Sequence, residues 1–371
     1  MSDFRIELAT HADDAAIRHL LATNPLPGRV TASFEREPSY FHGCATMGRE
    51  WQVLVARAGD NGHNELASVA CRAVRNVFAN GCEERLGYLG QLRVDARQRG
   101  RWLVSRGFRF LKQLHEADPV PAYLLSIIEG NEEATGVLVK RRRKHFPEVR
   151  ELGQLLTLAL PLGRPKPPLA CAAELARAQV SDLPEIVAFL RRHGARRQFY
   201  PAWTEADFST ASTTRDFKLA DFCIARRRGA IIGVIGLWDQ SGYKQTVARA
   251  YRGWLRVAKP LYNAVAPLAG RPRLPRVGEE IRYVYAAFIC VADDELAVFR
   301  ALLRAVYNLA VTRGHAYLML GLAAHDPLLP VARAYSHIVY PSRLYLAFWE
   351  GGEDFYARLD DRTLGIEIAT L

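Results

Sequence analysis

The stretch Arg85–Gly107, RLGYLGQLRVDARQRGRWLVSRG, carries the strongest local signal in this 371-residue chain. An apolar run ends at Val94, an Asp-Ala turn and a basic loop follow, and an amphipathic pattern continues to Ala117. This order predicts a strand, a loop and a helix. Backbone N–H groups at such a junction point towards whatever lies in front of the helix, where the positive end of the helix dipole also lies. The stretch therefore predicts a site for a pyrophosphate.

The order and spacing of this stretch resemble the central motif of the GCN5-related N-acetyltransferases (GNAT), which holds the pyrophosphate and pantetheine of acyl-CoA. Against the family's pattern Val-Asp-Pro-x-x-Arg-Gly-x-Gly-x-Gly/Ala, the matching residues are Val94, Asp95, Arg99 and Gly100. The resemblance implies that the pyrophosphate is held by Arg99, Gly100, Arg101 and Trp102 with their backbone. It also implies that the thioester carbonyl faces the backbone of Leu92, Arg93 and Val94.

Four positions depart from the family pattern. Ala96 replaces the usual proline, and Trp102 and Val104 replace the later small residues. Small residues let the backbone approach a phosphate closely, so Trp102 and Val104 are unfavourable to ordinary CoA binding. Many family members also place a general-acid tyrosine in the helix after the splayed strand, and by spacing the equivalent residue here is Leu138.

The flanking segments follow the family's order of elements. Ala122–Ile128 predicts a short buried strand, and Glu129-Gly130-Asn131 opens a helix that reaches Lys140. In the family this strand splays away from its neighbour, and an Asn-x-x-Ala helix start borders the pantetheine arm. Asn131 and Ala134 have that spacing, so the resemblance implies contact between Asn131 and the pantetheine. With the strands predicted upstream, the resemblance covers about residues 3–160: these strands are Phe4–Thr10, Trp51–Arg57 and Leu66–Val77.

The length of the chain favours two domains. Leu162–Leu169 contains three prolines, which can sustain neither a helix nor a central strand, and the order of elements restarts after it. We therefore predict an α/β (α+β) fold of two tandem GNAT-like domains, each a mixed, mostly antiparallel sheet flanked by helices. The N-terminal domain spans residues 1–161, the linker 162–169 and the C-terminal domain 170–371.

The equivalent junction of the second half is Val291–Glu295, which has three acids and neither glycine nor arginine. Three carboxylates repel a phosphate, although they suit a helix N-terminus. We therefore expect the second domain to bury a face of the first and to shape the acceptor site, without holding CoA in the family's manner.

Two side chains are candidates for proton transfer. Glu129 ends the predicted splayed strand, and Tyr88 lies on the strand before the loop. Each also has an ordinary structural explanation, as an acid at a helix N-terminus or as a half-buried aromatic of a sheet. The segment Glu35–Phe41 falls where the family lines its acceptor pocket, and its mixed charges and aromatics suit a polar acceptor or a helix cap.

Cysteine and histidine usage favours a reduced compartment and no metal. The six cysteines form no C-x-x-C pair, and the ten histidines show no ligand spacing. No apolar run approaches the ~18 residues of a transmembrane helix, and the first residues lack the pattern of a signal peptide. We expect a cytoplasmic protein, with peripheral attachment to the inner membrane face as a further option.

A basic insertion occupies residues 240–280. It has no Asp or Glu from Gln240 to Gly278, while eight Lys and Arg there account for most of the net charge of +11. Apolar residues at spacings of three and four predict one helix face, interrupted by Pro260 and Pro267: Val247, Tyr251, Trp254, Ala258, Leu261, Val265 and Leu268. The stripe could pack on the protein with its charges solvated, or residues 244–270 could lie on an anionic membrane. A lid over an anionic substrate is a third reading, and nucleic-acid binding ranks lowest because no recognisable module is present.

Together these features predict an acyl-CoA-dependent N-acyltransferase. The donor would be acetyl-CoA or another acyl-CoA, and the acceptor a small-molecule or peptide amine. The alternatives are a GNAT-shaped binding or scaffold protein without catalysis, and a membrane-surface acyltransferase for envelope or lipid-linked acceptors.

Overall fold

The computed structural model describes residues 4–58, 65–98, 103–140, 145–210 and 212–371. Its strands are β1 (Phe4–Leu8), β2 (Val30–Glu35), β3 (Glu50–Ala58), β4 (Glu65–Ala79), β5 (Cys82–Val94), β6 (Tyr123–Ile128), β7 (Glu148–Pro161), β8 (Glu174–Arg177), β9 (Phe222–Arg227), β10 (Ala230–Trp238), β11 (Gln245–Tyr251), β12 (Tyr283–Val291), β13 (Tyr317–Ala323) and β14 (Ile338–Phe348). Its α-helices are α1 (Asp14–Thr23), α2 (Cys44–Met47), α3 (Leu103–Ala117), α4 (Glu132–Leu138), α5 (Leu183–Gly194), α6 (Glu205–Ser209), α7 (Trp254–Val265), α8 (Leu296–Thr312), α9 (Leu329–Arg333) and α10 (Glu353–Ala357).

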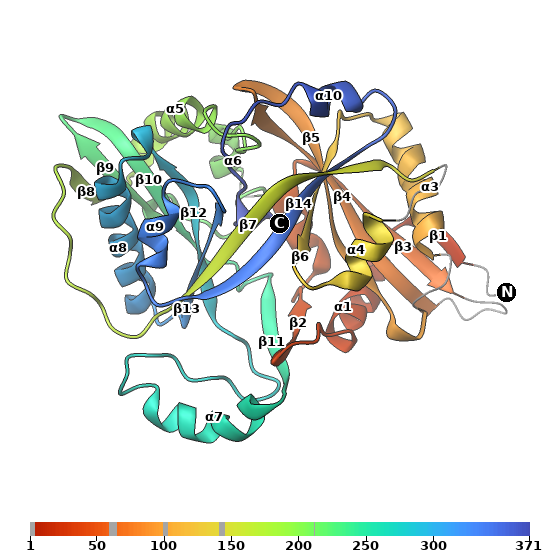
Figure 1. Ribbon diagram of the computed structural model, residues 1–371, viewed down its shortest axis with the longest axis horizontal. Coiled ribbons are helices and arrows are strands. Elements are labelled where there is room, and N and C mark those ends of the chain that lie inside the picture. The colour runs from red at the N-terminus through yellow and green to blue at the C-terminus, as the bar shows by residue number, and fades with distance from the viewer. Residues whose placement is uncertain (1–3, 59–64, 99–102, 141–144, 211) are drawn as a thin grey trace.

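One large sheet runs through the molecule in the order β1-β3-β4-β5-β6-β14-β7-β13-β12-β10-β9-β8 (Figure 1). Its pairs are antiparallel apart from β5–β6 and β12–β13, which are parallel. The predicted class, a mixed and mostly antiparallel sheet flanked by helices, is confirmed. Antiparallel strands can follow one another through short turns, and Asn80 and Gly81 make such a turn between β4 and β5, both with positive φ.

Side-chain alternation along the strands places different helices on the two faces of the sheet. In the first half, Val53, Val55 and Tyr88 pack with α1 and α2, whereas Leu54 and Leu89 face α3. The second half repeats this arrangement. There α5 covers the face that carries Val234 and Phe288, and α8 covers the face that carries Ile235 and Leu237.

The two halves of the chain share the centre of the sheet. β14 lies between β6 and β7 and pairs antiparallel with both, and β7 in turn pairs with β13. Thus a strand of the second half is inserted among those of the first. The proline-rich segment Leu162–Leu169 has no helix or strand and runs along α8, where the Lys166 backbone binds the Asn308 side chain. The division into domains at this segment stays a prediction.

The insertion differs from the sequence expectation. Val247 and Tyr251 belong to β11, which pairs with β2 in a separate two-stranded sheet, and the helix begins only at Trp254 after Gly253. The prediction of one helix face from Val247 to Leu268 was therefore wrong in its first third. Pro260 lies inside α7 without ending it. None of the helices in the described ranges is both long and apolar enough to cross a membrane.

Candidate functional site

The candidate site is the place where β5 and β6 separate, which we call the first divergence. β5 pairs with β6 at Gly87 and Tyr88, and over the described residues the pairing stops there. Gly87 is required at this point because a Cβ would lie 2.1 Å from the ring of Tyr123 on β6. Beyond Tyr88, β5 continues along β4 while β6 pairs with β14. The two strands therefore leave a gap that side chains or a ligand must fill.

β5 contains a bulge close to the point where it separates from β6. The register with β4 shifts between Val69 and Cys71, and Gln91 takes a left-handed conformation with φ of 58°. A bulge leaves a residue out of the ladder and re-aims the neighbouring backbone groups. The backbone predicted to face a thioester, at Leu92, Arg93 and Val94, follows this bulge directly.

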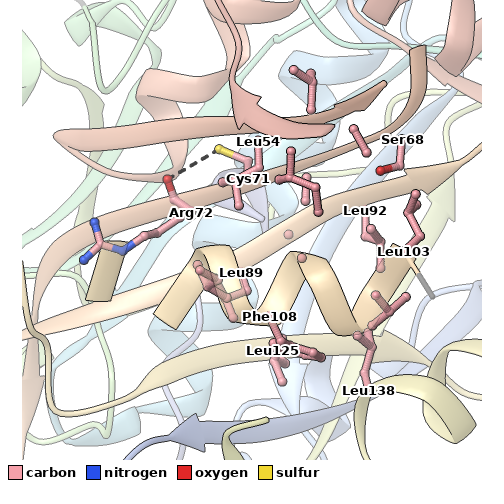
Figure 2. A pocket seen from close by; sticks show the side chains of 18 residues that line it. Leu54, Ser68, Cys71, Arg72, Leu89, Leu92, Leu103, Phe108, Leu125 and Leu138 are labelled. Carbon is pink, nitrogen blue, oxygen red and sulfur yellow. Dashed lines mark hydrogen bonds between the residues drawn. The ribbon is translucent and has the colours of Figure 1, made fainter. Parts of the chain in front are cut away.

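An apolar cavity of about 110 Å³ extends from this gap beneath α3 (Figure 2). Leu89, Gly90 and Leu92 of β5 line it on one side, and Leu125 of β6 and Leu138 of α4 on the other. Ser68, Cys71 and Arg72 of β4 also belong to its lining. The Arg72 guanidinium points away from the leucines in Figure 2, since it bonds the Asp118 backbone oxygen at 2.6 Å and the Tyr123 hydroxyl at 3.0 Å. The space therefore suits a hydrocarbon chain.

Gly107 keeps this cavity open. It lies on α3 in the cavity wall, and a Cβ at this position would meet no atom within 4 Å. A glycine in a helix interior lowers stability by about 0.5–1 kcal/mol relative to alanine. An apolar void also removes contacts from its lining. Gly107 and the void beside it therefore both lower the stability of the fold at this point of α3.

The turn after β5 is held by Asp95. Its carboxylate accepts the Arg97 backbone N–H at 2.8 Å, and the buried Asn24 side chain accepts the N–H of Ala96 at 2.9 Å. Arg97 pairs with Asp95 and Glu65, and its hydrogen bonds to these carboxylates raise its pKa. Asp95 thus shapes the loop. The predicted pyrophosphate residues Arg99, Gly100, Arg101 and Trp102 lie outside the described residues.

The two predicted proton-transfer residues lie apart from each other. Glu129 accepts hydrogen bonds from Gln154 at 2.6 Å and from Arg343 of β14 at 2.9 Å, and it does not line the cavity. Tyr88 is buried on the face opposite α3, and burial raises the pKa of its phenol. The Tyr88 backbone forms the last pair before the divergence, and its side chain, like that of Glu129, does not line the cavity.

Asn131 has a structural role at the start of α4. Its side-chain oxygen accepts the Ala134 N–H at 3.1 Å, so it is the N-cap of α4. Its predicted contact with pantetheine stays a prediction. Val104 and Leu138, two of the departures from the family pattern, both line the cavity.

The acids of the second junction are matched by arginines. Asp293 pairs with Arg196 at 2.5 Å, Asp294 with Arg197, and Glu295 with Arg227 at 2.7 Å. Hydrogen bonding to Arg196 lowers the pKa of Asp293. Each of the three carboxylates is thus paired with an arginine at the position where the first half has its basic loop.

Sequence reasoning missed what occupies the second divergence, between β12 and β13. Phe288 of β12 has φ of 54° and donates its backbone N–H to the Glu367 carboxylate at 2.6 Å. Ile368 packs so closely on Gly321 of β13 that a Cβ there would lie 2.1 Å from its side chain. The segment Leu364–Ile368 therefore lies in this gap beside a cavity of about 40 Å³, and burial raises the pKa of Glu367 to about 7.

Two buried basic side chains, Lys244 and Arg75, hold the residues that follow Ile368. The Lys244 ammonium donates to the Ala369 carbonyl at 3.0 Å and the Leu371 carbonyl at 3.2 Å, and burial lowers its pKa well below its usual range. Arg75 of β4 donates to the Thr370 hydroxyl at 2.6 Å. No sequence spacing signals these contacts, because each joins residues more than a hundred positions apart.

The part of the chain that the structure describes contains no group of three or more His, Cys, Asp or Glu side chains able to hold a metal ion. No protein-family model and no curated protein matches the sequence. Solved structures do match its fold. A GCN5-related N-acetyltransferase from Sphaerobacter thermophilus is 15% identical, with 99% of this chain and 98% of that one covered and a TM-score of 0.55.

Two further solved structures agree. The N-myristoyltransferase of Saccharomyces cerevisiae with bound myristoyl-CoA is 11% identical, with coverage of 94% and 83% and a TM-score of 0.62. A GCN5-related N-acetyltransferase from Anabaena variabilis is 10% identical, with coverage of 93% and 72% and a TM-score of 0.52. The chain therefore has the fold of the GCN5-related N-acetyltransferases.

Proposed function

We propose that this chain is an acyl-CoA-dependent N-acyltransferase whose donor enters the first divergence. The observation that carries the proposal is the open apolar cavity at the point where β5 bulges and leaves β6. The similar N-myristoyltransferase was solved with a fatty acyl-CoA bound. In the cytoplasm, where we expect the protein, acyl-CoA would be at hand.

The cavity supports a donor with an alkyl chain rather than an acetyl group. An engineered apolar cavity of about 150 Å³ stays dry and admits benzene. A space of about 110 Å³ would therefore take roughly four or five carbons. Acetyl transfer, the expectation from sequence, would leave most of this volume empty.

In the proposed reaction the acceptor amine attacks the thioester carbonyl. A C–N bond forms, the C–S bond breaks, and the proton lost by the amine ends on the CoA thiolate. Backbone N–H groups after the Gln91 bulge would stabilise the developing oxyanion. Tyr88, whose backbone forms the last pair between β5 and β6, would supply the proton from its phenol. Glu129, already bound to Arg343, is the weaker candidate for the base.

Tyr40 supports the proposed binding of an acceptor. It lies within Glu35–Phe41, the segment predicted from sequence to line the acceptor pocket. Tyr40 is buried next to the Cys44 and Cys71 thiols, and Cys71 also lines the cavity. Its hydroxyl has no hydrogen-bond partner among the described residues. A buried polar group without a partner is unfavourable, so this hydroxyl, on the sheet face that packs with α1 and α2, is the candidate to bind an acceptor amine that reaches the gap from the side opposite α3.

Calorimetric titration with CoA and with acyl-CoAs of two to sixteen carbons tests donor binding without knowledge of the acceptor. Each methylene that enters the cavity contributes about 0.8 kcal/mol, so affinity should rise about fourfold per carbon and then level off near six carbons. The absence of heat with any donor, in a folded sample, would contradict the proposed function. Equal affinity for CoA and all acyl-CoAs would contradict the acyl-chain assignment alone.

Release of free CoA thiol with a panel of small amines and peptides then tests catalysis. Tyr88→Phe should lower kcat about a hundredfold while donor affinity is unchanged, since general acids contribute at least this much. Binding of donors without thiol release from any amine would favour the alternative of a binding protein without catalysis. That alternative draws support from Leu138, which puts a leucine in the cavity wall at the position of the family's tyrosine.

A further inference from the structure

Helix α7 exposes its apolar side chains. Trp254, Val257, Leu261 and Leu268 are 63%, 81%, 71% and 78% exposed, and no residue of α7 itself is buried. Figure 1 shows α7 outside the layers of the sheet, beyond β11. The large apolar side chains of the predicted stripe from Trp254 to Leu268 therefore do not pack on the protein, whereas Tyr251 is buried. A cluster of exposed large apolar side chains of this kind marks an interaction surface.

These side chains form one stripe along the helix. Separations of three and four residues place Trp254, Val257 and Leu261 within about 60° of one another at 100° per residue, and Leu268 lies in the turn that follows the helix. Val265, 47% exposed, lies in the same stripe. The stripe therefore presents a continuous apolar edge to solvent.

The opposite side of α7 is fixed by the segment that follows it. Lys259 donates to the Pro275 carbonyl at 2.5 Å, Tyr262 to the Pro272 carbonyl at 3.2 Å, and the Asn263 amide to the Leu274 carbonyl at 2.9 Å. The Leu274 N–H returns a hydrogen bond to Asn263 at 2.8 Å. Because these contacts hold the helix in place, its apolar edge is preformed.

Positive charge surrounds this edge without compensating acids. Arg252 and Arg256 lie at the start of α7, Arg271 and Arg273 follow its end, and all four are exposed. None of the four forms an ion pair with a carboxylate of the described residues. The other basic residues of the insertion are engaged elsewhere: Lys244 points inward, and Arg249 pairs with Glu35.

We propose that α7 is an interfacial helix that docks this protein on an anionic lipid bilayer. The apolar stripe enters the boundary between headgroups and acyl chains, and the four arginines contact lipid phosphates. A nucleic acid would use the arginines and leave the stripe in water. A second copy of the chain would bring two unneutralised basic surfaces together, so the bilayer is the occupant that satisfies both features.

Flotation with phosphatidylglycerol-containing vesicles tests the proposal on the whole chain. The wild-type protein should float with these vesicles, bind more weakly as salt rises, and stay unbound with pure phosphatidylcholine. The triple variant Trp254→Ala/Leu261→Ala/Leu268→Ala should lose binding at least tenfold. The variant Arg252→Gln/Arg256→Gln/Arg271→Gln/Arg273→Gln should lose about fivefold per arginine.

Val180→Ala is the matched control, because Val180 is 78% exposed on another surface and should float like the wild type. All these side chains are exposed, so the variants should unfold at the same denaturant concentration. Failure of the wild type to float, or equal flotation of the triple variant, would overturn the proposal. The proposal would also be overturned if the wild type formed a dimer that does not float and the triple variant were monomeric. The stripe would then bind a second copy of the chain.

Discussion

The two strand divergences of this sheet have the same backbone and different contents. Each begins with a short parallel pair, followed by a bulge whose residue has positive φ: Gln91 in β5 and Phe288 in β12. At the second divergence the segment Leu364–Ile368 occupies the gap and leaves a cavity of only about 40 Å³, and Glu367 accepts the N–H of the bulge residue. At the first, an apolar cavity remains. The geometry thus creates a space at each divergence, and we propose that the larger one, at the first divergence, takes a ligand.

The covering helices differ in the same way. α8 buries eight residues against the second half, and a Cβ at Gly233 beneath it would lie 2.7 Å from Leu302. α3 buries Leu103, Phe108 and Leu111, and a Cβ at Gly107 would meet nothing. The second half is thus packed for stability, and the first is packed around an opening.

The largest effect is expected where the chain fills its own gap. Ile368→Ala should lower the free energy of unfolding by about 3 kcal/mol, because it removes a buried side chain that packs on Gly321 and leaves a cavity. Chemical denaturation measures this loss. Ile338→Ala is the control, since Ile338 is 44% exposed and should change stability by less than about 0.5 kcal/mol. Equal effects of the two substitutions would remove the distinction between a filled and an open divergence.

Filling the first divergence should affect ligand binding instead. Gly107→Leu places a side chain in the cavity, so affinity for hexanoyl-CoA should fall about fiftyfold while affinity for acetyl-CoA is kept. Calorimetry with both donors measures the change. Gly136→Leu on α4 is the matched control, because Gly136 also has open space around it but does not line the cavity. A loss of affinity that is equal for both donors would place the acyl chain elsewhere.

The segment that fills the second divergence should make stability depend on pH. Glu367 has a folded-state pKa of about 7, above its ordinary value of 4.5, so between these values the folded state holds a proton that the unfolded state has lost. Stability is therefore greatest at low pH, and it should fall by about 2 kcal/mol from pH 5 to 7 on this account.

Glu367→Gln removes this titration and can still accept the N–H groups of Phe288 and Ala369 through its amide oxygen. The unfolding free energy of this variant should not fall between pH 5 and 7 as that of the wild type does. Arg75 and Lys244 are present in both proteins, so the difference between the two pH profiles reports on Glu367. A parallel pH dependence in the two would mean that Glu367 is ionised throughout the range.

Local patterns in the sequence predicted much of this fold, and long-range pairing accounts for what they missed. α3 follows from the amphipathic pattern that continues to Ala117, and β6 follows from the apolar run Ala122–Ile128. The spacing of Val247 and Tyr251 fits a helix as well as a strand. This segment forms a strand because it pairs with β2, some two hundred residues away. The insertion of β14 between β6 and β7 has no local signal either.

The candidate site divides in the same way. The strand-to-helix junction and the splayed β6 could be predicted, because the motif that carries them is continuous in sequence. The pairing of Glu129 with Arg343, 214 residues later, could not, and it changes what Glu129 can do. Nor could the filling of the second divergence by Leu364–Ile368, since it depends on where β12 and β13 separate.

The smallest expected effects come from adding one methyl group next to each of the two divergences. Gly107→Ala should raise the free energy of unfolding by about 0.5–1 kcal/mol, because alanine favours the helix and its Cβ meets no atom. Gly233→Ala should lower it by about 1–3 kcal/mol, since the Cβ would press on Leu302 and Val298 beneath α8. Denaturation of both variants under one buffer measures the difference in sign. If Gly107→Ala also keeps its affinity for hexanoyl-CoA, the opening in α3 is wider than one methyl group, whereas destabilisation by Gly107→Ala would show that α3 is closed onto the sheet.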